Sequence, residues 1–353
     1  MRKKVTIHDI ARKLNITAST VSRALNNHPK ISRKTKKLVR QTAEKLGYKP
    51  NTIATALRSG NSKLVGVIVP NIDRSFFSSI ISGIESVLNP AGYHVIITQS
   101  RELLANEISN MEALLNAQVD GILMSISRET YSFDHIGKAI KNGRRIIFFD
   151  RIIEELPVSS VVVDDMDGAY KAVKQLIEQG YQRIAHFSVN PRISVYKDRL
   201  RGYKTALEDN GMKLRPEYIL EVSNKEESGI KAIEKLLKMK EVPDAIFSSS
   251  DFSALGAMQY LQDHNIRIPE DIGIWGFSNE PFTKFLTPPL SSVDQNATKM
   301  GETVARVFLD QINLSGSTEV GQKIVLRPDL HIRKSSLKKD IVSIQKDKLQ
   351  IDH

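Results

Sequence analysis

Residues 64–312 alternate short apolar runs with amphipathic helical stretches, and this alternation constrains the fold more than any other feature of the chain. The apolar runs span residues 64–69, 94–98, 121–126, 145–149, 160–163, 183–189, 218–222, 245–247 and 272–277. The helical stretches span residues 77–88, 105–117, 169–179, 198–210, 229–238, 254–264 and 299–312. Such alternation is typical of doubly wound parallel sheets. Because the strands are too many for one small sheet, the sequence predicts two α/β lobes, and residues 241–246 weakly repeat the pattern of residues 118–123.

The basic residues are concentrated at the amino-terminal end. Residues 1–63 contain sixteen Lys/Arg and two acids, a net charge of +14, whereas the other 290 residues hold 35 basic and 38 acidic side chains, a net charge of −3. A charge excess confined to one segment indicates a polyanionic partner, because each neutralised phosphate releases condensed counterions. The alternative is a solvated, disordered basic tail. Apolar residues at helical spacing in the same segment argue against that alternative.

This basic segment has the pattern of three short helices around a small core. Thr6, Thr17 and Ser32 each precede apolar residues at helical spacing, Thr6 with Asp9 in a capping box. Asn15 and Gly47 stand where the first and third helices should end. The residues expected in the core are Ile7, Ile10, Ala11, Leu14, Ile16, Val21, Ala24, Leu25, Leu38, Val39, Thr42, Ala43 and Leu46. Two short helices joined by a tight turn predict an all-α helix-turn-helix headpiece, whose second helix can enter a DNA major groove.

Three stretches of the headpiece resemble the lactose/galactose repressor (LacI/GalR) family of bacterial transcription regulators. They are VTIHDIA at residues 5–11, STVSRALN at residues 19–26 and GYKPN at residues 47–51, and together they are very specific. The resemblance implies a helix-turn-helix DNA-binding domain in residues 1–50. It also implies a hinge helix and linker in residues 51–62, ordered when two subunits meet on the operator. The alternative is a plain flexible linker, which Gly60 and its polar neighbours favour.

The resemblance also assigns the DNA contacts. Ala18 and Ser19 match the variable base-reading positions, and Arg23 matches an arginine that can bridge O6 and N7 of guanine. Leu57 matches the side chain that wedges into the central base step of the minor groove, with Ala54 beside it. Polar side chains and the Lys/Arg of residues 30–40 are expected on phosphates. The full DNA-binding set is Thr6, Thr17, Ala18, Ser19, Thr20, Ser22, Arg23, Asn26, Asn51, Ala54 and Leu57.

For residues 63–333 the resemblance implies the two-lobed periplasmic-binding-protein fold, used as an effector-binding and dimerisation domain. The expected N-lobe comprises about residues 63–164 and 296–328, the C-lobe about residues 165–295, and the chain crosses near residues 164, 295 and 328. Small molecules bind at the carboxyl ends of strands in such sheets. The expected effector-binding residues are Asp73, Phe76, Phe77, Arg199, Phe247, Asp251, Ser278 and Asn279. The alternatives are core filling for the aromatic residues and an exposed helix charge for Arg199.

One position departs from the family pattern. The family commonly has Asp after a Gly-aromatic pair, where it binds sugar hydroxyls or a base, but Ser278 follows Gly276-Phe277 here. A hydroxyl cannot supply the charge-assisted hydrogen bonds of a carboxylate. Asn279 or Glu280 is the candidate to compensate. A carbohydrate or a sugar derivative is the expected effector.

Other features exclude several classes of protein. There is no cysteine, no apolar stretch of membrane-spanning length and no secretory signal, so the sequence predicts a cytoplasmic protein without a membrane partner. No phosphate-binding loop, dinucleotide motif or nucleophile motif occurs, and no cofactor or metal is expected. His94 and His186 are predicted to be buried in strands, and Asp164 and Asp165 to point to opposite faces of a strand end. The polar tail, residues 334–353, is expected to fray.

The resemblance implies a transcription regulator, in the first place a repressor, that binds double-stranded operator DNA as a homodimer under the control of a small-molecule effector. One competing class is a periplasmic-type sugar-binding protein without a DNA function, which would need an export signal and no basic headpiece. The other is an α/β enzyme, for which the sequence offers no catalytic motif.

Overall fold

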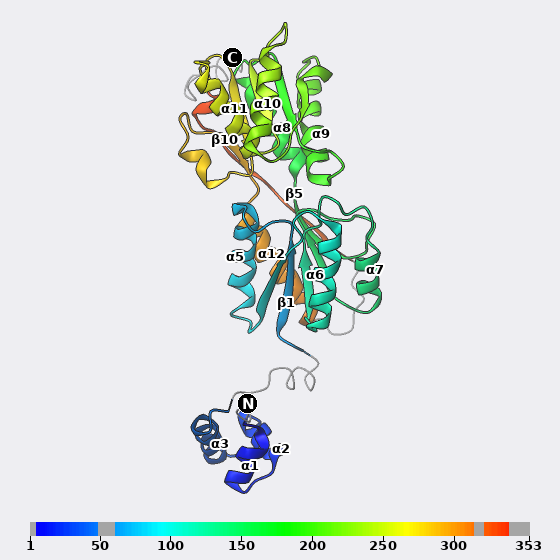
Figure 1. The fold of residues 1–353 in the computed structure, drawn as a ribbon, viewed down its shortest axis with the longest axis vertical. Helices are drawn as coiled ribbons and strands as arrows, with labels where there is room; N and C mark the ends of the chain where they lie inside the picture. The colour runs from blue at the N-terminus through cyan, green and yellow to red at the C-terminus, as the bar shows by residue number, and fades with distance from the viewer. Residues whose placement is uncertain (1–4, 49–60, 314–320, 339–353) are drawn as a thin grey trace, which may run out of the picture. The chain divides into compact units, whose positions relative to one another are not determined.

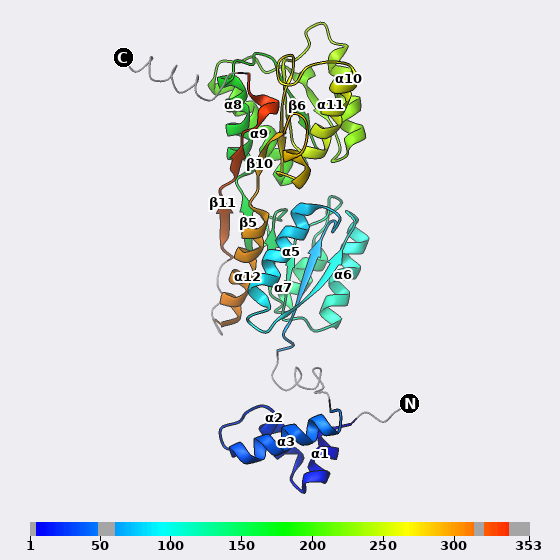
Figure 2. The same ribbon diagram turned by 90° about the vertical axis from the view of Figure 1, so that its left-hand side faces the viewer.

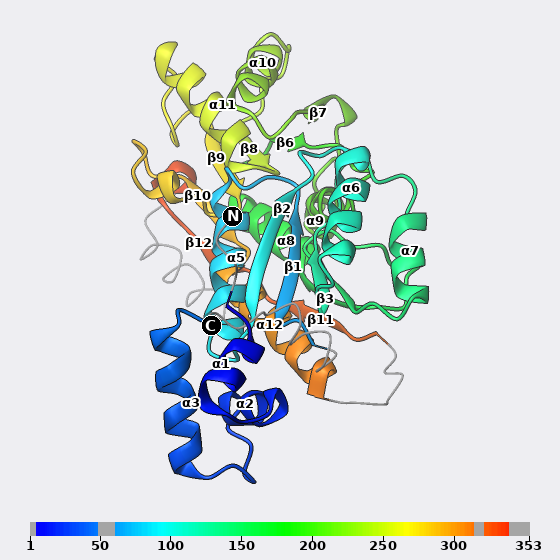
Figure 3. The same cartoon turned by 60° about the horizontal axis from the view of Figure 1, so that its bottom comes forward.

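The computed structural model describes residues 5–48, 61–313 and 321–338, and the chain divides into two compact units, residues 1–62 and 63–353 (Figure 1). The first unit is a helical headpiece. Its helices are α1 (Ile7–Leu14), α2 (Ala18–Leu25) and α3 (Arg33–Lys45) (Figure 3). The side chains buried between them are Ile10, Ala11, Val21, Ala24, Val39, Thr42 and Ala43.

The predicted helix ends of the headpiece are confirmed. The Thr6 amide donates to Asp9 Oδ2 at 2.9 Å, and Thr17 Oγ1 accepts from the Thr20 amide at 3.2 Å. Asn15 ends α1 with a φ of 50° and Gly47 follows α3 with a φ of 65°. Leu38 was expected in the core but is 50% exposed. Successive residues of a helix are rotated by about 100°, and Leu38 therefore lies at the edge of the face that buries Val39.

The second unit begins with a lobe built on a six-stranded parallel sheet in the order β11-β5-β4-β3-β1-β2. Its strands are β1 (Leu64–Val69), β2 (His94–Gln99), β3 (Gly121–Met124), β4 (Ile146–Phe149), β5 (Ser159–Val163) and β11 (Lys323–Leu326). Helices α5 (Ser75–Leu88) and α12 (Ala297–Asn313) lie side by side on one face (Figure 2). Helices α6 (Leu104–Asn116) and α7 (Asp134–Lys141) cover the other face.

The second lobe repeats this plan with the strand order β12-β10-β9-β8-β6-β7, in which β12 alone runs antiparallel to its neighbour. Its strands are β6 (Ile184–Ser188), β7 (Ile219–Glu221), β8 (Ala245–Ser248), β9 (Gly273–Phe277), β10 (Ser291–Asp294) and β12 (Asp329–His331). Helices α8 (Asp165–Glu178) and α9 (Ser194–Asp209) pack on one face, and α10 (Glu226–Leu237) and α11 (Asp251–Asp263) on the other. Three single turns complete it, η1 (Pro216–Tyr218), η2 (Pro281–Lys284) and η3 (Lys334–Ser336).

The chain passes between the two sheets three times. It leaves the first sheet after β5, returns after β10 to form α12, and crosses again between β11 and β12. Three connecting segments therefore join the lobes. The two-lobed α/β fold class predicted from the sequence is confirmed.

Glycines bring α5 and α12 into direct backbone contact. A Cβ atom on Gly83 would lie 2.2 Å from the carbonyl oxygen of Thr298, and one on Gly301 would lie 2.0 Å from that of Ile80. Real Cβ atoms do not approach backbone so closely, and only glycine fits at these two positions. The pair of helices is therefore packed without an intervening layer of side chains.

Two local expectations are wrong. His94 is exposed, because β2 is an edge strand whose side chains meet solvent. Asp164 and Asp165 do not end a strand. Asp164 caps α8 by accepting from the Asp167 amide at 2.9 Å, and Asp165 is the buried first residue of that helix. Helical geometry therefore turns the Asp165 carboxylate into the lobe.

The polar tail is ordered beyond the expected point. Ser335 and Ser336 are fully buried, and Ser335 Oγ donates to the carbonyl oxygen of Ile274 at 2.7 Å. The amide of Ser291 donates to the same Ser335 hydroxyl at 2.8 Å. These bonds hold the tail against β9 and β10, so the prediction of fraying from residue 334 is wrong; residues 339–353 lie outside the described part of the chain.

His186 gives the second lobe a predictable pH dependence. Its ring is fully buried between Tyr203 and Phe247, and burial lowers the pKa of His186 from 6.5 to about 4. The imidazole therefore binds a proton more tightly in the unfolded chain than in the folded one. The contribution of neutral His186 to stability is present in full above pH 6.5 and is lost as the pH falls towards 4. We expect it to lower the free energy of unfolding by about 2 kcal/mol between pH 7.5 and pH 5.

Urea denaturation at the two pH values measures this effect. His186→Phe keeps the ring stacking and removes the titrating group, so its loss of stability on acidification should be smaller than that of the wild type by the same amount. An equal loss in both proteins would contradict the assignment to His186.

Candidate ligand pocket and DNA-binding surface

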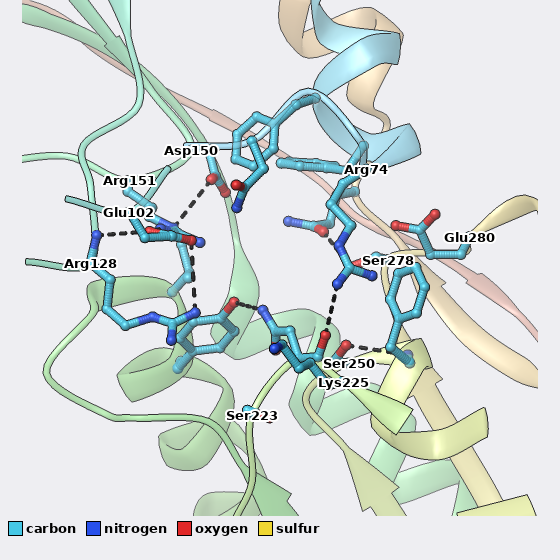
Figure 4. A pocket seen from close by; sticks show the side chains of 18 of the residues that line it. Arg74, Glu102, Arg128, Asp150, Arg151, Ser223, Lys225, Ser250, Ser278 and Glu280 are labelled. Carbon is cyan, nitrogen blue, oxygen red and sulfur yellow. Dashed lines mark hydrogen bonds and ion pairs between the residues drawn. The ribbon is translucent and has the colours of Figure 1, made fainter. Parts of the chain in front are cut away.

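A pocket with an internal volume of about 380 Å³ lies where the carboxyl ends of the two sheets face each other (Figure 4). This volume falls within the range of small-molecule sites. Most of its lining residues follow a strand directly or begin the next helix. From the first lobe they are Asn71, Arg74, Phe76, Phe77, Arg101, Glu102, Arg128, Asp150 and Arg151. From the second lobe and its connection they are Val195, Tyr196, Arg199, Ser223, Asn224, Lys225, Ser250, Phe252, Ser278, Glu280 and Gln295.

On the first-lobe side the pocket is lined by a charged cluster. Arg151 Nη1 lies 2.8 Å from Glu102 Oε2, and the guanidinium of Arg128 lies 3.8 Å from the same carboxylate. Arg151 Nε is 3.8 Å from Asp150 Oδ2, too far for a hydrogen bond. Burial alone would raise the pKa of Glu102, but the charge and hydrogen bond of Arg151 bring it below its usual value. For Asp150 burial prevails and raises the pKa.

On the second-lobe side Arg199 is the central charge. It is 4% exposed, its Nε donates to Asp165 Oδ1 at 2.8 Å, and its Nη1 donates to the carbonyl oxygen of Ser249 at 2.8 Å. Its guanidinium carbon lies 3.7 Å from the centre of the Phe277 ring. Burial raises the pKa of Asp165, and the Arg199 charge opposes that shift. The alternative of an exposed helix charge at Arg199 is therefore wrong.

The amino-terminal end of α5 contacts the second lobe directly. Arg74 Nη2 donates to the carbonyl oxygen of Asn224 at 3.0 Å, and its guanidinium lies 3.8 Å from the centre of the Phe252 ring. The Ser75 hydroxyl donates to Glu280 Oε2. Burial raises the pKa of Glu280, while this hydrogen bond favours its ionised form. The two lobes thus meet through polar groups that also line the pocket.

The structure brings only some of the predicted effector-binding residues together. Phe76, Phe77, Arg199 and Ser278 line the pocket. Asn279 lies in an adjoining hollow, where its Nδ2 donates to Asp294 Oδ2 at 2.9 Å. Asp73 is exposed and lies outside the pocket lining.

Phe247 and Asp251 lie behind the pocket, in the core of the second lobe. Phe247 is fully buried and stacks on His186 with ring centres 5.1 Å apart. Asp251 accepts from the amide of Glu280 at 2.8 Å, and burial raises the pKa of Asp251 to about 7. The expectation that these two side chains line the pocket is wrong, because they lie within the sheet and on the inner side of α11; Asp251 instead holds the loop that carries Glu280.

Most of the charged lining residues were missed from the sequence. The signal that could have found them is a charged residue within four residues of the carboxyl end of a strand, as at Glu102, Arg128 and Arg151. Backbone geometry gives a second indication, because Glu102, Asp150 and Ser278 have φ values of 65°, 61° and 112°. Such strained positions concentrate at functional sites.

The predicted DNA-reading surface is centred on α2. Ser19, Arg23 and Asn26 are exposed, whereas Ala18 and Ser22 are half-buried. The Thr17 hydroxyl bonds to those of Ser19 and Thr20 at 2.8 and 2.9 Å, forming a hydroxyl cluster at the start of the helix. Thr6 is exposed at the start of α1. Asn51, Ala54 and Leu57 lie outside the described residues.

Two of the cations expected on phosphates also support the headpiece itself. Arg40 Nη2 donates to Asn27 Oδ1 at 2.6 Å, and Lys36 Nζ donates to the carbonyl oxygen of Asn27 at 3.0 Å. Both bonds tie the end of α2 to α3. They orient the exposed face of α2 relative to the basic face of α3.

Two negative findings concern the described residues alone. Within residues 5–48, 61–313 and 321–338, no cluster of three His, Asp or Glu side chains is placed to hold a metal ion. None of the helices in these ranges has the length and apolar character needed to cross a membrane.

Comparison with known proteins places both units of the chain. Residues 6–51 match the family model of bacterial regulatory proteins, lacI family, and residues 62–333 match that of periplasmic binding proteins and sugar binding domain of LacI family. Catabolite control protein A of Priestia megaterium is 34% identical over 310 residues, which cover 88% of this chain and 93% of that protein.

Solved structures agree in fold. The lac repressor dimer bound to operator and the anti-inducer ONPF superposes with a TM-score of 0.83 at 25% identity, over 95% of this chain and 100% of that one. The transcriptional regulator CelR–cellobiose complex superposes with a TM-score of 0.71 at 26% identity, over 94% and 100%.

Proposed function

Because this chain belongs to the LacI family of bacterial regulatory proteins, we propose that it is a transcriptional repressor whose affinity for operator DNA is set by a small sugar-like molecule in the pocket between its lobes. The observation that carries the proposal is the union, in one chain, of a basic three-helix headpiece with a two-lobed polar pocket. A DNA-binding protein without a ligand would not need the pocket, and a ligand-binding protein without a DNA function would not need the headpiece.

The headpiece supplies what a DNA-reading unit needs. The exposed residues Ser19 and Arg23 of α2, and Asn26 at its end, offer donors and acceptors to base edges and phosphates. Among the ion pairs of the described residues, none involves Arg23, so its guanidinium is available to a guanine. The basic residues around this face supply affinity that falls with salt.

The pocket supports a polar, polyhydroxylated effector. The relatives include a regulator solved with cellobiose, and the matching family model describes a sugar-binding domain. Guanidinium, carboxylate and amide groups from both lobes can each bond to sugar hydroxyls, and Phe76 offers an aromatic face. The Ser278 position lacks the family's carboxylate, but Glu280 of the same loop lines the pocket and can take its place.

We infer that the active form is a homodimer, because a two-fold symmetric protein reads a palindromic operator and the similar lac repressor was solved as an operator-bound dimer. Because an operator-binding protein acts where the chromosome is, we place this chain in the cytoplasm. We infer four segments along the chain: a headpiece in residues 1–50, a hinge and linker in residues 51–62, an effector-binding and dimerisation domain in residues 63–333, and a tail in residues 334–353. The tail begins with residues that are packed against the second lobe as far as the buried Ser336.

Coupling between the two sites follows from the contacts of α5. A ligand that closes or opens the lobes must make or break the bonds of Arg74 and Ser75 to the second lobe. Lobe movement would change the separation of the two hinge segments in the dimer. A ligand shifts this equilibrium only by its differential affinity for the two states.

Selection of genomic fragments by the purified full-length protein tests the proposal. We expect enrichment of palindromic sites at moderate salt and a change in their affinity when sugars are added. Binding without preference over random duplex, with and without sugars, would refute the proposed function. The alternative of a sugar-binding protein without a DNA function predicts that outcome.

Leu57→Gly tests the proposed hinge. Loss of an intercalating side chain removes the surface gained by bending the duplex, so operator affinity should fall by at least about tenfold, while effector affinity stays unchanged. Electrophoretic mobility shift and calorimetry measure the two affinities. Operator affinity equal to that of the wild type would leave residues 51–62 as a plain linker.

A further inference from the structure

The pocket carries more positive than negative charge. Its lining cations outnumber its lining carboxylates by six to three; the cations are Arg74, Arg101, Arg128, Arg151, Arg199 and Lys225, and the carboxylates are Glu102, Asp150 and Glu280. An uncharged sugar needs no such excess, because a hydroxyl group bonds equally well to neutral amides. The imbalance is therefore a property that the proposed sugar site has to explain.

The existing ion pairs leave part of this charge uncompensated. Arg199 is paired with Asp165, and Arg151 and Arg128 share Glu102. Arg74, Arg101 and Lys225 take part in no ion pair among the described residues. These three cations come from the two lobes, and all of them reach the same pocket.

The three lining carboxylates also have partners within the protein. Glu102 lies 2.8 Å from Arg151 and 3.8 Å from Arg128, Asp150 lies 3.8 Å from Arg151, and Glu280 accepts from the Ser75 hydroxyl. Even with all three ionised, they are half as many as the lining cations.

A buried donor points to a ligand independently of the charge count. Arg151 is 4% exposed, and its Nε has no hydrogen-bond partner among the described residues. A buried donor without an acceptor costs the full desolvation of that group. Because Arg151 lines the pocket, an oxygen atom of a bound molecule can satisfy this donor.

Arg74 and Lys225 bring unpaired cations of both lobes together. Arg74 belongs to the first lobe, and it donates to the carbonyl oxygen of Asn224, the residue that precedes Lys225 in the second lobe. Figure 4 shows Arg74 directed towards the loop that carries Lys225, away from the cluster of Glu102 and Arg151. An anionic group at this point would bond to both lobes at once.

We propose that the effector is an acidic sugar derivative, one that carries a carboxylate or a phosphate group, with the acidic group held between Arg74 and Lys225. This inference rests on the proposed function and specifies the chemical class of its ligand. A guanidinium and an ammonium bind either anion through charge-assisted hydrogen bonds, which are about twice as strong as neutral ones. The sugar hydroxyls would then face Arg151, Glu102 and Asp150 across the pocket.

Binding of such a ligand also explains how lobe closure is favoured. Closure brings the cations of the two lobes closer together, and like charges repel in a poorly solvated pocket. An anion bound between them turns that repulsion into attraction. A neutral sugar leaves it in place.

Calorimetry on the full-length protein tests the proposal with matched sets of ligands. The sets are glucose, glucuronate and glucose 6-phosphate, and galactose, galacturonate and galactose 6-phosphate, all at the same ionic strength. We expect at least one acidic member to bind at least about tenfold more tightly than its neutral parent. The uronate and phosphate members distinguish the two kinds of acidic group.

Lys225→Met identifies the charge that is responsible. Lys225 is exposed, so the substitution should leave the thermal unfolding midpoint unchanged and weaken the acidic ligand by about tenfold, with little effect on the neutral parent. Lys231→Met is the matched control and should change nothing, because Lys231 is exposed on α10, the helix that follows Lys225, and lies outside the pocket.

Three results would overturn the proposal: a neutral sugar that binds as tightly as its acidic forms, no binding by any acidic member, or the same loss in Lys231→Met as in Lys225→Met. Operator binding is measured separately on the same protein. A failure of DNA recognition would therefore appear in that measurement, and a neutral effector that shifts operator binding would leave the proposed function intact.

Discussion

Removing residues 1–62 is expected to abolish the preference for operator DNA and to leave the binding of a sugar ligand unchanged. The deleted segment has a net charge of +13, which exceeds the +11 of the whole chain, and it has its own buried core around Ile10 and Val39. The remaining unit keeps both sheets and every residue that lines the pocket. Fluorescence anisotropy with labelled operator and calorimetry with ligand measure the two activities on the same preparations.

The full-length protein on a scrambled duplex of equal length is the control, because it reports the affinity that charge alone provides. The truncated protein should fall below even that value, since it has lost the cations that contact phosphates. Retention of operator preference after truncation would place DNA recognition outside the headpiece and would contradict the proposed function.

Arg199→Met should lower the free energy of unfolding by about 3–5 kcal/mol, because it leaves the buried carboxylate of Asp165 without a partner. The carbonyl oxygen of Ser249 loses its donor as well. Burial raises the pKa of Asp165, and without Arg199 nothing opposes that shift. In the wild type the pKa of Asp165 is already raised to about 7, so below that pH Asp165 is largely protonated in both folded proteins. The deficit should therefore grow as the pH rises through about 7, where only the wild type gains from ionising Asp165, and shrink on acidification below it.

Arg201→Met is the matched control on the same helix. Arg201 is exposed, pairs with the neighbouring Asp198 at 3.3 Å and donates from Nε to Met166 Sδ at 3.0 Å, so its loss should cost less than about 1 kcal/mol. The double variant Asp165→Asn/Arg199→Met removes both charges and should recover part of the stability lost in Arg199→Met. Equal unfolding free energies for Arg199→Met and Arg201→Met would show that the buried pair contributes nothing.

The headpiece could be predicted from the sequence nearly residue by residue, because its structure is set by local rules. The Thr17 and Ser32 hydroxyls accept from amides three residues further on, Asp9 accepts from the amide of Thr6, and the apolar face has a simple helical period. The prediction that Leu38 lies in the core was wrong, because packing, and not the helical period, decides whether a residue at the edge of an apolar face is buried.

The two parallel sheets were predicted as well, but the boundaries of their helices were not. Helices α8 and α9 begin at Asp165 and Ser194, four residues before the stretches that show apolar periodicity. The first turn of α8 carries Asp165 and Asp167, and the first turn of α9 contributes Val195 and Tyr196 to the pocket, so the apolar period begins later than the helical backbone. The short strands β10, β11 and β12 were missed because two of them lie at sheet edges and none has a long apolar run.

The pocket was the least predictable part, since it is assembled from loops far apart in the chain. The resemblance correctly directed attention to the strand ends, yet it placed Phe247 and Asp251 in the pocket, where the structure has them one layer behind. It overlooked most of the cations in the lining, because a single charge shortly after a strand, such as Arg128 or Lys225, is a weak signal by itself. Only the topology shows that they converge.

The close approach of α5 and α12 at Gly83 and Gly301 has a mechanical consequence. Where main chain touches main chain there is no soft layer of rotatable groups to absorb a displacement, so the two helices must tilt or translate as one rod. A displacement of Arg74 or Ser75 at one end of α5 therefore moves the whole helix, together with α12. A bulkier residue at Gly301 would make this contact more flexible. The first lobe would then deform when α5 is displaced, whereas it now moves as a unit.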